Sequence, residues 1–167
     1  MTDYYDFETT QELHKNISYY TQRFILYPEK IMGLTLPVDL RWQSIQFISD
    51  NKSAVSEQQG VYAFVIRHED SNLPVHGYIA YFGITTRTLR DRYGEYLQDQ
   101  KRPKRPPIHE LLNKWKNCIY FCFAEVMDIN IDLHTIEKQL NGSMLPPYST
   151  QDFDADIRQA KGIWEKT

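Results

Sequence analysis

Two side chains in the second half of the chain have the chemistry to act on a phosphate group. Arg92 lies in residues 87–98, a predicted helix, and Tyr96 follows it at a spacing of four, on the same helical face. A guanidinium is permanently charged and can bond two phosphate oxygens at once. Glu137 lies beside the apolar stripe of another predicted helix, residues 131–141, where a buried carboxylate needs a partner.

Phosphodiester hydrolysis is the reaction that these residue types suit. Enzymes commonly accelerate their reactions ~10⁶ to 10¹⁷-fold, and one general base supplies only ~10² to 10⁴ of that. A cation and a metal ion directed at the developing charge would supply much of the rest. Glu137 could hold Mg²⁺ together with waters and substrate oxygens. Simpler interpretations stay open, with Arg92 as a solvated helix residue and Glu137 in an ion pair or at an exposed edge.

A small α+β framework has to position these residues. Aromatic and β-branched runs predict strands at residues 60–66, 78–84 and 118–127. The first two are joined by a polar loop and are expected to form an antiparallel hairpin. Helices are predicted at residues 87–98 (capped by Thr85 or Thr86), 108–116 and 131–141 (ending at Asn141-Gly142). The expected fold is a small antiparallel three-stranded sheet flanked by helices, in the order β-β-α-α-β-α.

Outside this framework we expect a mainly helical N-terminal extension and a short C-terminal helix. The extension covers residues 1–57, and apolar side chains recur at helical spacing in residues 9–26 and again in residues 40–49. Residues 58–150 form the domain that contains the hairpin, and residues 151–167 carry the last helix. The first helix could form a dimer interface or pack on the domain, and both interpretations stay open.

Positive charge is concentrated in one part of a chain whose net charge is −3. Residues 80–123 contain nine Lys and Arg against four Asp and Glu, whereas the rest of the chain is acidic. This distribution favours a local surface that meets phosphate, although a solvated basic face without a partner would look the same. Within it, the stretch 101–107 has the sequence KRPKRPP, and its prolines predict a loop.

Two tripeptides lie on the predicted hairpin, and further residues follow them at suggestive positions. The set consists of Gly60-Val61-Tyr62, Tyr81-Phe82-Gly83, Thr85, Leu89, Arg92, Glu137 and Pro146-Pro147-Tyr148. This combination resembles the GIY-YIG endonuclease superfamily, over about residues 58–150. The resemblance implies a Mg²⁺-dependent DNA endonuclease, with Mn²⁺ able to substitute, that acts on duplex or branched DNA.

The resemblance also implies a role for each matching residue. The predicted catalytic residues are Tyr62, Tyr81, Arg92, Tyr96 and Glu137, with Glu137 as the metal ligand. The predicted nucleic-acid contacts are Gly83, Thr85, Arg87, Lys101, Arg102, Lys104, Arg105 and Ser149. In the family the first Tyr is thought to help activate the attacking water. A phenol with a pKa of ~10 can do so only if a nearby cation, here Arg92 or the metal, lowers that value.

Three features depart from the family's pattern. The stretch between the tripeptides, residues 63–80, is longer than the usual tight hairpin. Ile84 stands where some relatives have Lys, and Ser149 where the family usually has Asn. Ser can still donate and accept a hydrogen bond, but its reach is shorter. Because Arg92 and Glu137 are retained, these departures are compatible with reduced activity and do not indicate a dead site.

The sequence also leads to expectations about cellular location and biological role. No apolar run approaches the roughly 18 residues that span a bilayer, and the N-terminus is acidic, unlike a secretory leader. A cytoplasmic protein without membrane contact is therefore expected. A restriction or phage-defence nuclease, possible as a homodimer, is the first expectation, and a mobile-element or repair nuclease is the second. The alternative class is a non-catalytic module that uses the same fold to bind nucleic acid or a protein.

Overall fold

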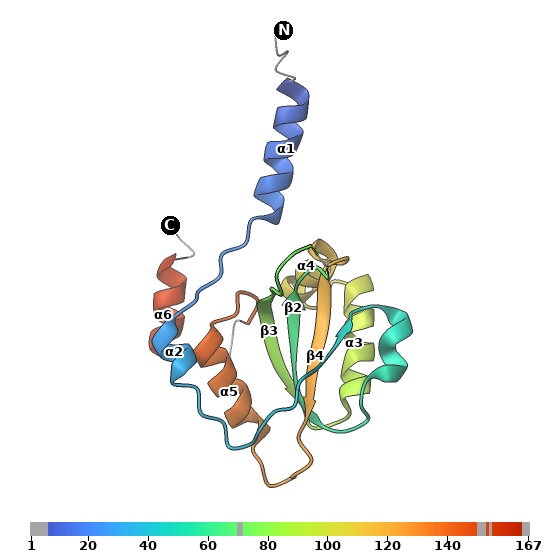
Figure 1. Ribbon diagram of the computed structural model, residues 1–167, viewed down its shortest axis with the longest axis vertical. Helices are drawn as coiled ribbons and strands as arrows, with labels where there is room; N and C mark the ends of the chain where they lie inside the picture. The colour runs from blue at the N-terminus through green and yellow to red at the C-terminus, as the bar shows by residue number, and fades with distance from the viewer. Residues whose placement is uncertain (1–6, 70–71, 150–152, 154, 165–167) are drawn as a thin grey trace.

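In the computed structural model, which describes residues 7–69, 72–149, 153 and 155–164, an antiparallel sheet lies between helices (Figure 1). This arrangement confirms the α+β class. The elements in chain order are α1 (Phe7–Tyr20), α2 (Pro28–Met32), β1 (Gln43–Gln46), the 3-10 helix η1 (Ser49–Ala54), β2 (Gly60–Ile66), β3 (Tyr78–Thr85), α3 (Leu89–Lys101), α4 (Pro106–Lys114), β4 (Ile119–Glu125), α5 (Leu133–Met144) and α6 (Ala155–Trp164). Residues 165–167, the end of the predicted C-terminal segment, lie outside the described residues.

Strands β2 and β3 form the predicted antiparallel hairpin, and their register decides which side chains share a face. Tyr62 lies opposite Gly83, and Phe64 lies opposite Tyr81. Directly opposed residues point to the same side of a sheet, so Tyr62 and Tyr81 are presented on one face. Strand β4 pairs with the other side of β2, which leaves β3 at the edge of the sheet. From Gly60 onward, the order β2-β3-α3-α4-β4-α5 confirms the predicted order.

The sheet has four strands, so the prediction of three was wrong. Strand β1 adds to the outer side of β4, where Ile45 lies opposite Phe121. It comes from residues 40–49, whose spacing of apolar side chains predicted a helix. Pairing with the open backbone edge of β4 outweighs that local pattern, because strand preference depends on packing and burial more than on the residues alone. The N-terminal extension is therefore not wholly helical and contributes directly to the sheet.

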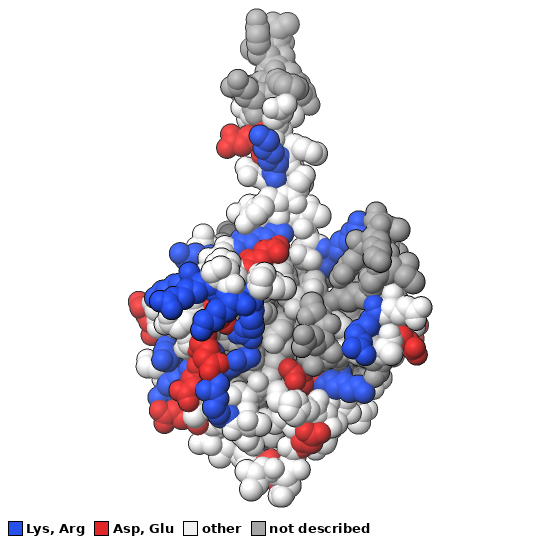
Figure 2. Space-filling model, turned by 180° about the vertical axis from the view of Figure 1, so that it is seen from behind, with Lys and Arg blue, Asp and Glu red and all other residues white. Residues whose placement is uncertain are grey.

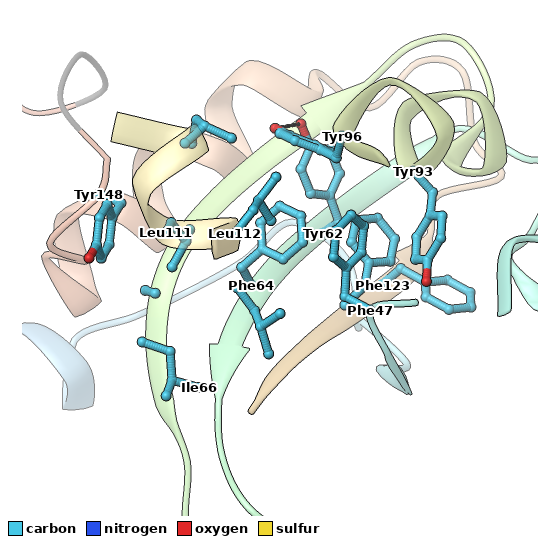
Figure 3. Packing of buried hydrophobic residues seen from close by; sticks show 14 of the residues in the cluster. Phe47, Tyr62, Phe64, Ile66, Tyr93, Tyr96, Leu111, Leu112, Phe123 and Tyr148 are labelled. Carbon is cyan, nitrogen blue, oxygen red and sulfur yellow. Dashed lines mark hydrogen bonds between the residues drawn. The ribbon is translucent and has the colours of Figure 1, made fainter. Parts of the chain in front are cut away.

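Strand β2 is apolar on both faces because helices cover both faces of the sheet. Tyr62 and Phe64 point toward α3 and α4 into an aromatic core, part of which Figure 3 shows. Val61 and Ala63 point the other way into a second core against α5, the α5 core. The ring of Tyr62 stacks on Phe121 of β4 with centroids 5.3 Å apart. This two-sided burial explains why residues 60–66 read as a continuous apolar run.

Helix α3 begins later than predicted. Its N-cap is Thr88, whose side-chain oxygen accepts a hydrogen bond from the Asp91 N–H at 2.9 Å. The predicted caps, Thr85 and Thr86, were wrong because β3 continues through Thr85. At its other end α3 includes Lys101, and prolines 106 and 107 begin α4. The predicted loop over the basic stretch is thus shorter than expected, since proline suits the first turn of a helix, where its missing N–H needs no partner.

Helix α5 continues past Asn141-Gly142, which the sequence predicted as its stop. It ends at Met144, and the next residue, Leu145, has the left-handed backbone angles φ 46° and ψ 52°. Two prolines follow, Pro146 and Pro147, and proline cannot extend a helix. The stop therefore comes from the prolines, and a non-glycine residue adopts a conformation that is costly for a side chain with a Cβ.

Helix α1 stands away from the rest of the protein (Figure 1). Leu13 and Ile17, from the predicted apolar stripe, are 57% and 60% exposed. Contact with the domain is made near the helix end, where the Tyr20 ring lies 5.5 Å from that of Trp115. The helix ends at Tyr20, earlier than the predicted residue 26. None of the described helices has the length and apolarity that a membrane crossing requires.

The fold predicts unequal effects of two N-terminal deletions. Residues 9–20 are exposed, so removing residues 1–20 is expected to change the unfolding free energy little. Removing residues 1–48 also deletes β1 and Phe47, which is 1% exposed, and loss of such a ring alone costs about 3–5 kcal/mol. Urea denaturation of both variants measures the difference, and equal losses would contradict the place of β1 in the sheet.

Candidate active site

The Tyr62 hydroxyl lies at the centre of a buried hydrogen-bond network between β2 and α3. It accepts a hydrogen bond from Nε of Arg92 at 2.8 Å. A second hydrogen bond, 3.0 Å long, joins it to the hydroxyl of Tyr96, as Figure 3 shows. Arg92 and Tyr96 are four residues apart on α3, so their predicted shared face is confirmed. Tyr62 and Tyr96 are 1% and 0% exposed, which puts both phenols inside the aromatic core.

Arg92 is fixed from several sides while one part of its side chain remains at the surface. Its Nη1 donates to Oε2 of Glu95 at 2.7 Å, and Glu95 also forms an ion pair with Arg87. The Arg92 guanidinium carbon lies 4.9 Å from the centre of the Tyr96 ring. Its side chain is 23% exposed. The interpretation of Arg92 as a freely solvated helix residue is therefore wrong.

The surroundings keep both Tyr62 and Arg92 protonated. Burial raises the pKa of the Tyr62 hydroxyl well above its usual value, with Tyr96 and Tyr81 adding to the effect and Arg92 opposing it. For Arg92, burial alone would lower the pKa, but Tyr96, Tyr62 and Glu95 outweigh it and raise the pKa. Arg92 lowers the pKa of Tyr62, as expected, but burial is the larger effect, so Arg92 by itself does not make this phenol a base. The effect of a metal ion on Tyr62 stays a prediction.

Tyr81 connects this network to the edge of the sheet. Its ring centre lies 6.4 Å from that of Tyr62 and 6.4 Å from that of Tyr96, and the side chain is half-buried. Burial raises the pKa of Tyr81, Tyr96 and the negative charge of Glu137 raise it further, and Arg92 opposes them. Glu137 thus acts on Tyr81 across the space between α5 and β3.

Glu137 has the setting expected of a functional carboxylate. Its neighbours Ile136 and Leu140 are buried in the α5 core, which confirms its predicted place beside the apolar stripe. The side chain is only 12% exposed, and Nδ1 of His134 lies 3.7 Å from its Oε2. His134 itself is 77% exposed, as expected for a surface residue.

A hard cation fits the donors present at Glu137. Among the described residues, no three His, Cys, Asp or Glu side chains gather in one place. Mg²⁺ commonly keeps several waters and binds one or two carboxylates plus substrate oxygens. The carboxylate of Glu137, 12% exposed, is one such oxygen donor.

Gly83 allows the Tyr62 phenol to lie across β3. A Cβ at position 83 would overlap the Tyr62 hydroxyl and lie 2.6 Å from its Cζ, so a side chain cannot fit without displacing the ring. Gly60 has a comparable constraint, because a Cβ there would overlap the carbonyl oxygen of Ala124 on β4. Both glycines of the tripeptides thus have a packing reason that the sequence did not reveal.

Three of the predicted nucleic-acid contacts are buried. Thr85 and Ser149 are 6% and 1% exposed, and Gly83 is buried under Tyr62. The Ser149 hydroxyl accepts a hydrogen bond from the Phe82 N–H at 3.3 Å, and the Tyr148 N–H donates to the Ala80 carbonyl at 3.0 Å. These bonds cover the free edge of β3. A nucleic-acid role for the three residues stays a prediction, beside the structural role described.

The remaining predicted contacts lie on the α3 and α4 side of the molecule, where Figure 2 shows Lys and Arg side chains gathered together with acidic ones. These residues are Arg87, Lys101, Arg102, Lys104 and Arg105. Arg105 differs from the others in its contact with the core. Its guanidinium carbon lies 4.7 Å from the centre of the Tyr96 ring, and its Nη2 forms an ion pair with the buried Asp99. The basic loop and the phenol network are therefore joined through Arg105.

Sequence reasoning missed two acidic residues of the site. Glu95 and Asp99 hold Arg92 and Arg105, respectively. The spacing of three between Arg92 and Glu95 on one helix was a usable signal, because such pairs are neighbours on a helix surface. The Arg105–Asp99 pair spans the end of α3, and its geometry depends on a loop that local patterns do not determine.

Comparison of the chain with protein-family models, with curated proteins and with solved structures found no match. The resemblance to GIY-YIG nucleases therefore stands on the residues named above.

Opposite effects are expected from alanine at two glycines. Gly83→Ala forces a Cβ against the Tyr62 phenol, and overpacking of this kind costs about 1–3 kcal/mol. Gly142→Ala places a Cβ in α5 where nothing lies within 4 Å, and it is expected to gain about 0.5–1 kcal/mol in helix stability. Thermal and urea unfolding of the pair measure this contrast. Equal stability of the two variants would contradict the packing of Tyr62 over Gly83.

Stability is expected to fall on the alkaline side. Burial raises the pKa of Tyr93 to about 12, from an ordinary value near 10. Between these values the unfolded chain has released the proton and the folded chain has kept it, so folding stability is full below pH 10 and declines as the pH rises toward 12. Urea denaturation between pH 8 and 12 measures the slope, which Tyr93→Phe should reduce. An unchanged slope in that variant would contradict the assignment.

Proposed function

We propose that the protein is a metal-dependent DNA endonuclease that hydrolyses phosphodiester bonds, with Mg²⁺ as the natural ion and Mn²⁺ as a substitute. The observation that carries the proposal is the fixed, partly exposed guanidinium of Arg92. The pKa of Tyr81, on β3, responds to the charges of both Arg92, which lowers it, and Glu137, which raises it. A rigid cation and a half-buried carboxylate are what phosphodiester hydrolysis requires. The resemblance of the two tripeptides to those of GIY-YIG nucleases supports the same conclusion.

The burial of the side chains divides them into two roles. Tyr62 and Tyr96 are inside the core, so they act as positioning residues that orient the Arg92 guanidinium. Arg92 itself binds the scissile phosphate and stabilises the charge that develops on its oxygens. Because its partners hold it before substrate arrives, little reorganisation is needed when the charge forms.

Tyr81 is the phenol that can reach the substrate. It is half-buried, and burial, Tyr96 and Glu137 all raise its pKa. The hydroxyl is therefore protonated at neutral pH and serves as a hydrogen-bond donor to a phosphate oxygen or to the attacking water. In this arrangement neither Tyr81 nor Tyr62 acts as the general base.

Glu137 would hold the metal ion. When bound, Mg²⁺ supplies Lewis-acid stabilisation of the phosphate and lowers the pKa of a coordinated water. The carboxylate of Glu137, on the helix α5 that packs against β3, would contribute a hard oxygen donor, and its negative charge raises the pKa of Tyr81 on that strand. Its low exposure limits competition from solvent and from basic side chains of the surface.

DNA is the proposed polymer, as duplex or branched substrate. Arg105 provides a second cation near Arg92, on the same Tyr96 ring. Lys101, Arg102 and Lys104 are exposed beside it and extend the positive surface along the backbone of the nucleic acid. Phosphate contacts of this kind give affinity and register but no sequence preference. A restriction or phage-defence role is proposed first, with two copies acting together to cut both strands.

A non-catalytic nucleic-acid-binding module on the same fold is the second candidate. The observation that favours it is the buried and protonated hydroxyl of Tyr62, which in the described protein does not reach solvent. Such a module would keep the basic surface and would have no use for Glu137. The two candidates therefore differ in what a change at Glu137 does.

Cleavage of supercoiled plasmid with Mg²⁺ or Mn²⁺ separates them. Wild type is expected to nick or linearise the plasmid. Glu137→Gln, which keeps the size but removes the charge, and Arg92→Lys, which keeps the charge but removes the planar fork, should each lose at least about 10²-fold in rate, as removal of one stabilising group does in other enzymes. Glu125→Gln, at an exposed carboxylate on β4, and Arg41→Lys, at an exposed arginine outside the basic stretch, are the matched controls and should cut normally.

Binding of the same plasmid, measured by mobility shift in Ca²⁺, completes the test. Retained binding by every variant, with loss of cleavage in the first two alone, is the expected pattern. A wild type that binds DNA and never cuts it would reject the nuclease in favour of the binding module.

A further inference from the structure

Asn141 is an unexplained polar residue in the interior of the protein. The residue is 0% exposed, and neither its Oδ1 nor its Nδ2 has a hydrogen-bond partner among the described residues. Buried amides are nearly always hydrogen-bonded, because removing one from water without a partner costs free energy. An apolar residue would fill this place in the α5 core at lower cost. The amide therefore calls for a ligand or water that is bound in the working protein.

The helix geometry relates Asn141 to Glu137. The two residues are four positions apart in α5, so they lie one above the other on the same flank of the helix. Side chains in a helix lean toward its N-terminus, which directs the amide of Asn141 to the turn that carries Glu137. On the opposite flank, Gln139 lines a cavity of about 410 Å³ with Lys30 and Gly33 of the α2 region.

Amide chemistry suits the surroundings of a hydrated cation. The carbonyl oxygen of an Asn side chain accepts hydrogen bonds from waters, whose protons point away from a cation that they coordinate. The NH₂ group donates to a carboxylate oxygen that the cation leaves free. An Asn next to a single carboxylate ligand can thus hold both the water shell and the carboxylate in place. Partners of this kind orient the ligands in metal sites generally.

We propose that Asn141 is a positioning residue of the Glu137 metal site, with its amide bound to the hydration shell of the cation. This inference rests on the proposed function, because the nuclease is what requires the cation. It adds a residue that the tripeptide resemblance does not include. It also explains why a buried position of α5 has an amide side chain. The amide lowers the stability of the fold but is kept because the metal site needs it.

The test compares stability and ion binding in two variants. Asn141→Leu replaces the amide with an apolar group of similar branching, and Asn141→Ala is the smaller variant that cannot overfill the site. Without metal, both are expected to have a melting temperature equal to or above that of wild type. In titrations with Mn²⁺ alone, followed by the electron paramagnetic resonance signal of the free ion, both should bind at least about tenfold more weakly.

Gln139→Met is the matched control. Gln139 also has a buried side-chain oxygen that finds no hydrogen-bond partner among the described residues, but it lies on the flank of α5 away from Glu137. Its replacement is expected to leave Mn²⁺ affinity unchanged, whereas Glu137→Gln should remove the site. The proposal is overturned if wild type shows no Glu137-dependent Mn²⁺ binding, or if both Asn141 variants bind Mn²⁺ as wild type does. It is also overturned if both variants have a lower melting temperature than wild type, because the amide would then have a structural partner.

The experiments distinguish a failure of the proposed nuclease function from a failure of the proposed role of Asn141. If wild type binds Mn²⁺ through Glu137 and Asn141 but never cuts plasmid, the nuclease is rejected and the metal site stands. If wild type cuts plasmid while the Asn141 variants keep full Mn²⁺ affinity, the nuclease stands and this inference is rejected.

Discussion

The hydrogen bond from Nε of Arg92 to the Tyr62 hydroxyl is the interaction on which the candidate site depends. A guanidinium that is more than half withdrawn from water is costly unless its donors are paired, and removing one partner of such a pair is strongly destabilising. Here Tyr62 pairs one donor and Glu95 another, while the Tyr96 ring lies against the guanidinium. The same interaction ties α3 to the central strand of the sheet. Orientation of the cation and cohesion of the fold therefore have one physical origin.

Several features of the sequence follow from the need to bring the Tyr62 phenol to that point. The ring lies flat against Phe121 and passes over β3 at Gly83, the position opposite it, where no side chain would fit. On the far side of β3, residues 148–149 form hydrogen bonds to Ala80 and Phe82, so this edge of the sheet is partly covered against pairing with other strands. Helix α5 packs against β3 on the face of the sheet away from Tyr62. The residues of the two tripeptides thus have a packing role in the sheet, and the proposed chemistry depends on that packing.

What the sequence could predict was set by local pattern, and what it could not was set by tertiary contacts. Alternating and β-branched runs gave the hairpin, and helical spacing placed Arg92 with Tyr96 and Glu137 beside its apolar stripe. Strand β1 escaped prediction because its partner, β4, lies more than seventy residues away, as in the pair Ile45 and Phe121. The protonated state of Tyr62 also escaped prediction, since burial raises its pKa by more than the neighbouring Arg92 lowers it, and the depth of burial is a tertiary property. For the same reason Asn141 read as a helix stop and turned out to be a buried amide.

The central claim is that a metal ion at Glu137 and the guanidinium of Arg92 act on the same phosphate. Anomalous X-ray diffraction from crystals grown with Mn²⁺ and a non-hydrolysable DNA duplex tests it most directly. The account predicts one strong anomalous peak bound by the Glu137 carboxylate, with a duplex phosphate lying between that ion and Arg92 and within hydrogen-bond reach of the Tyr81 hydroxyl. Mn²⁺ bound at another place, or a duplex lying on a face that leaves Arg92 and Glu137 without a phosphate, would contradict it.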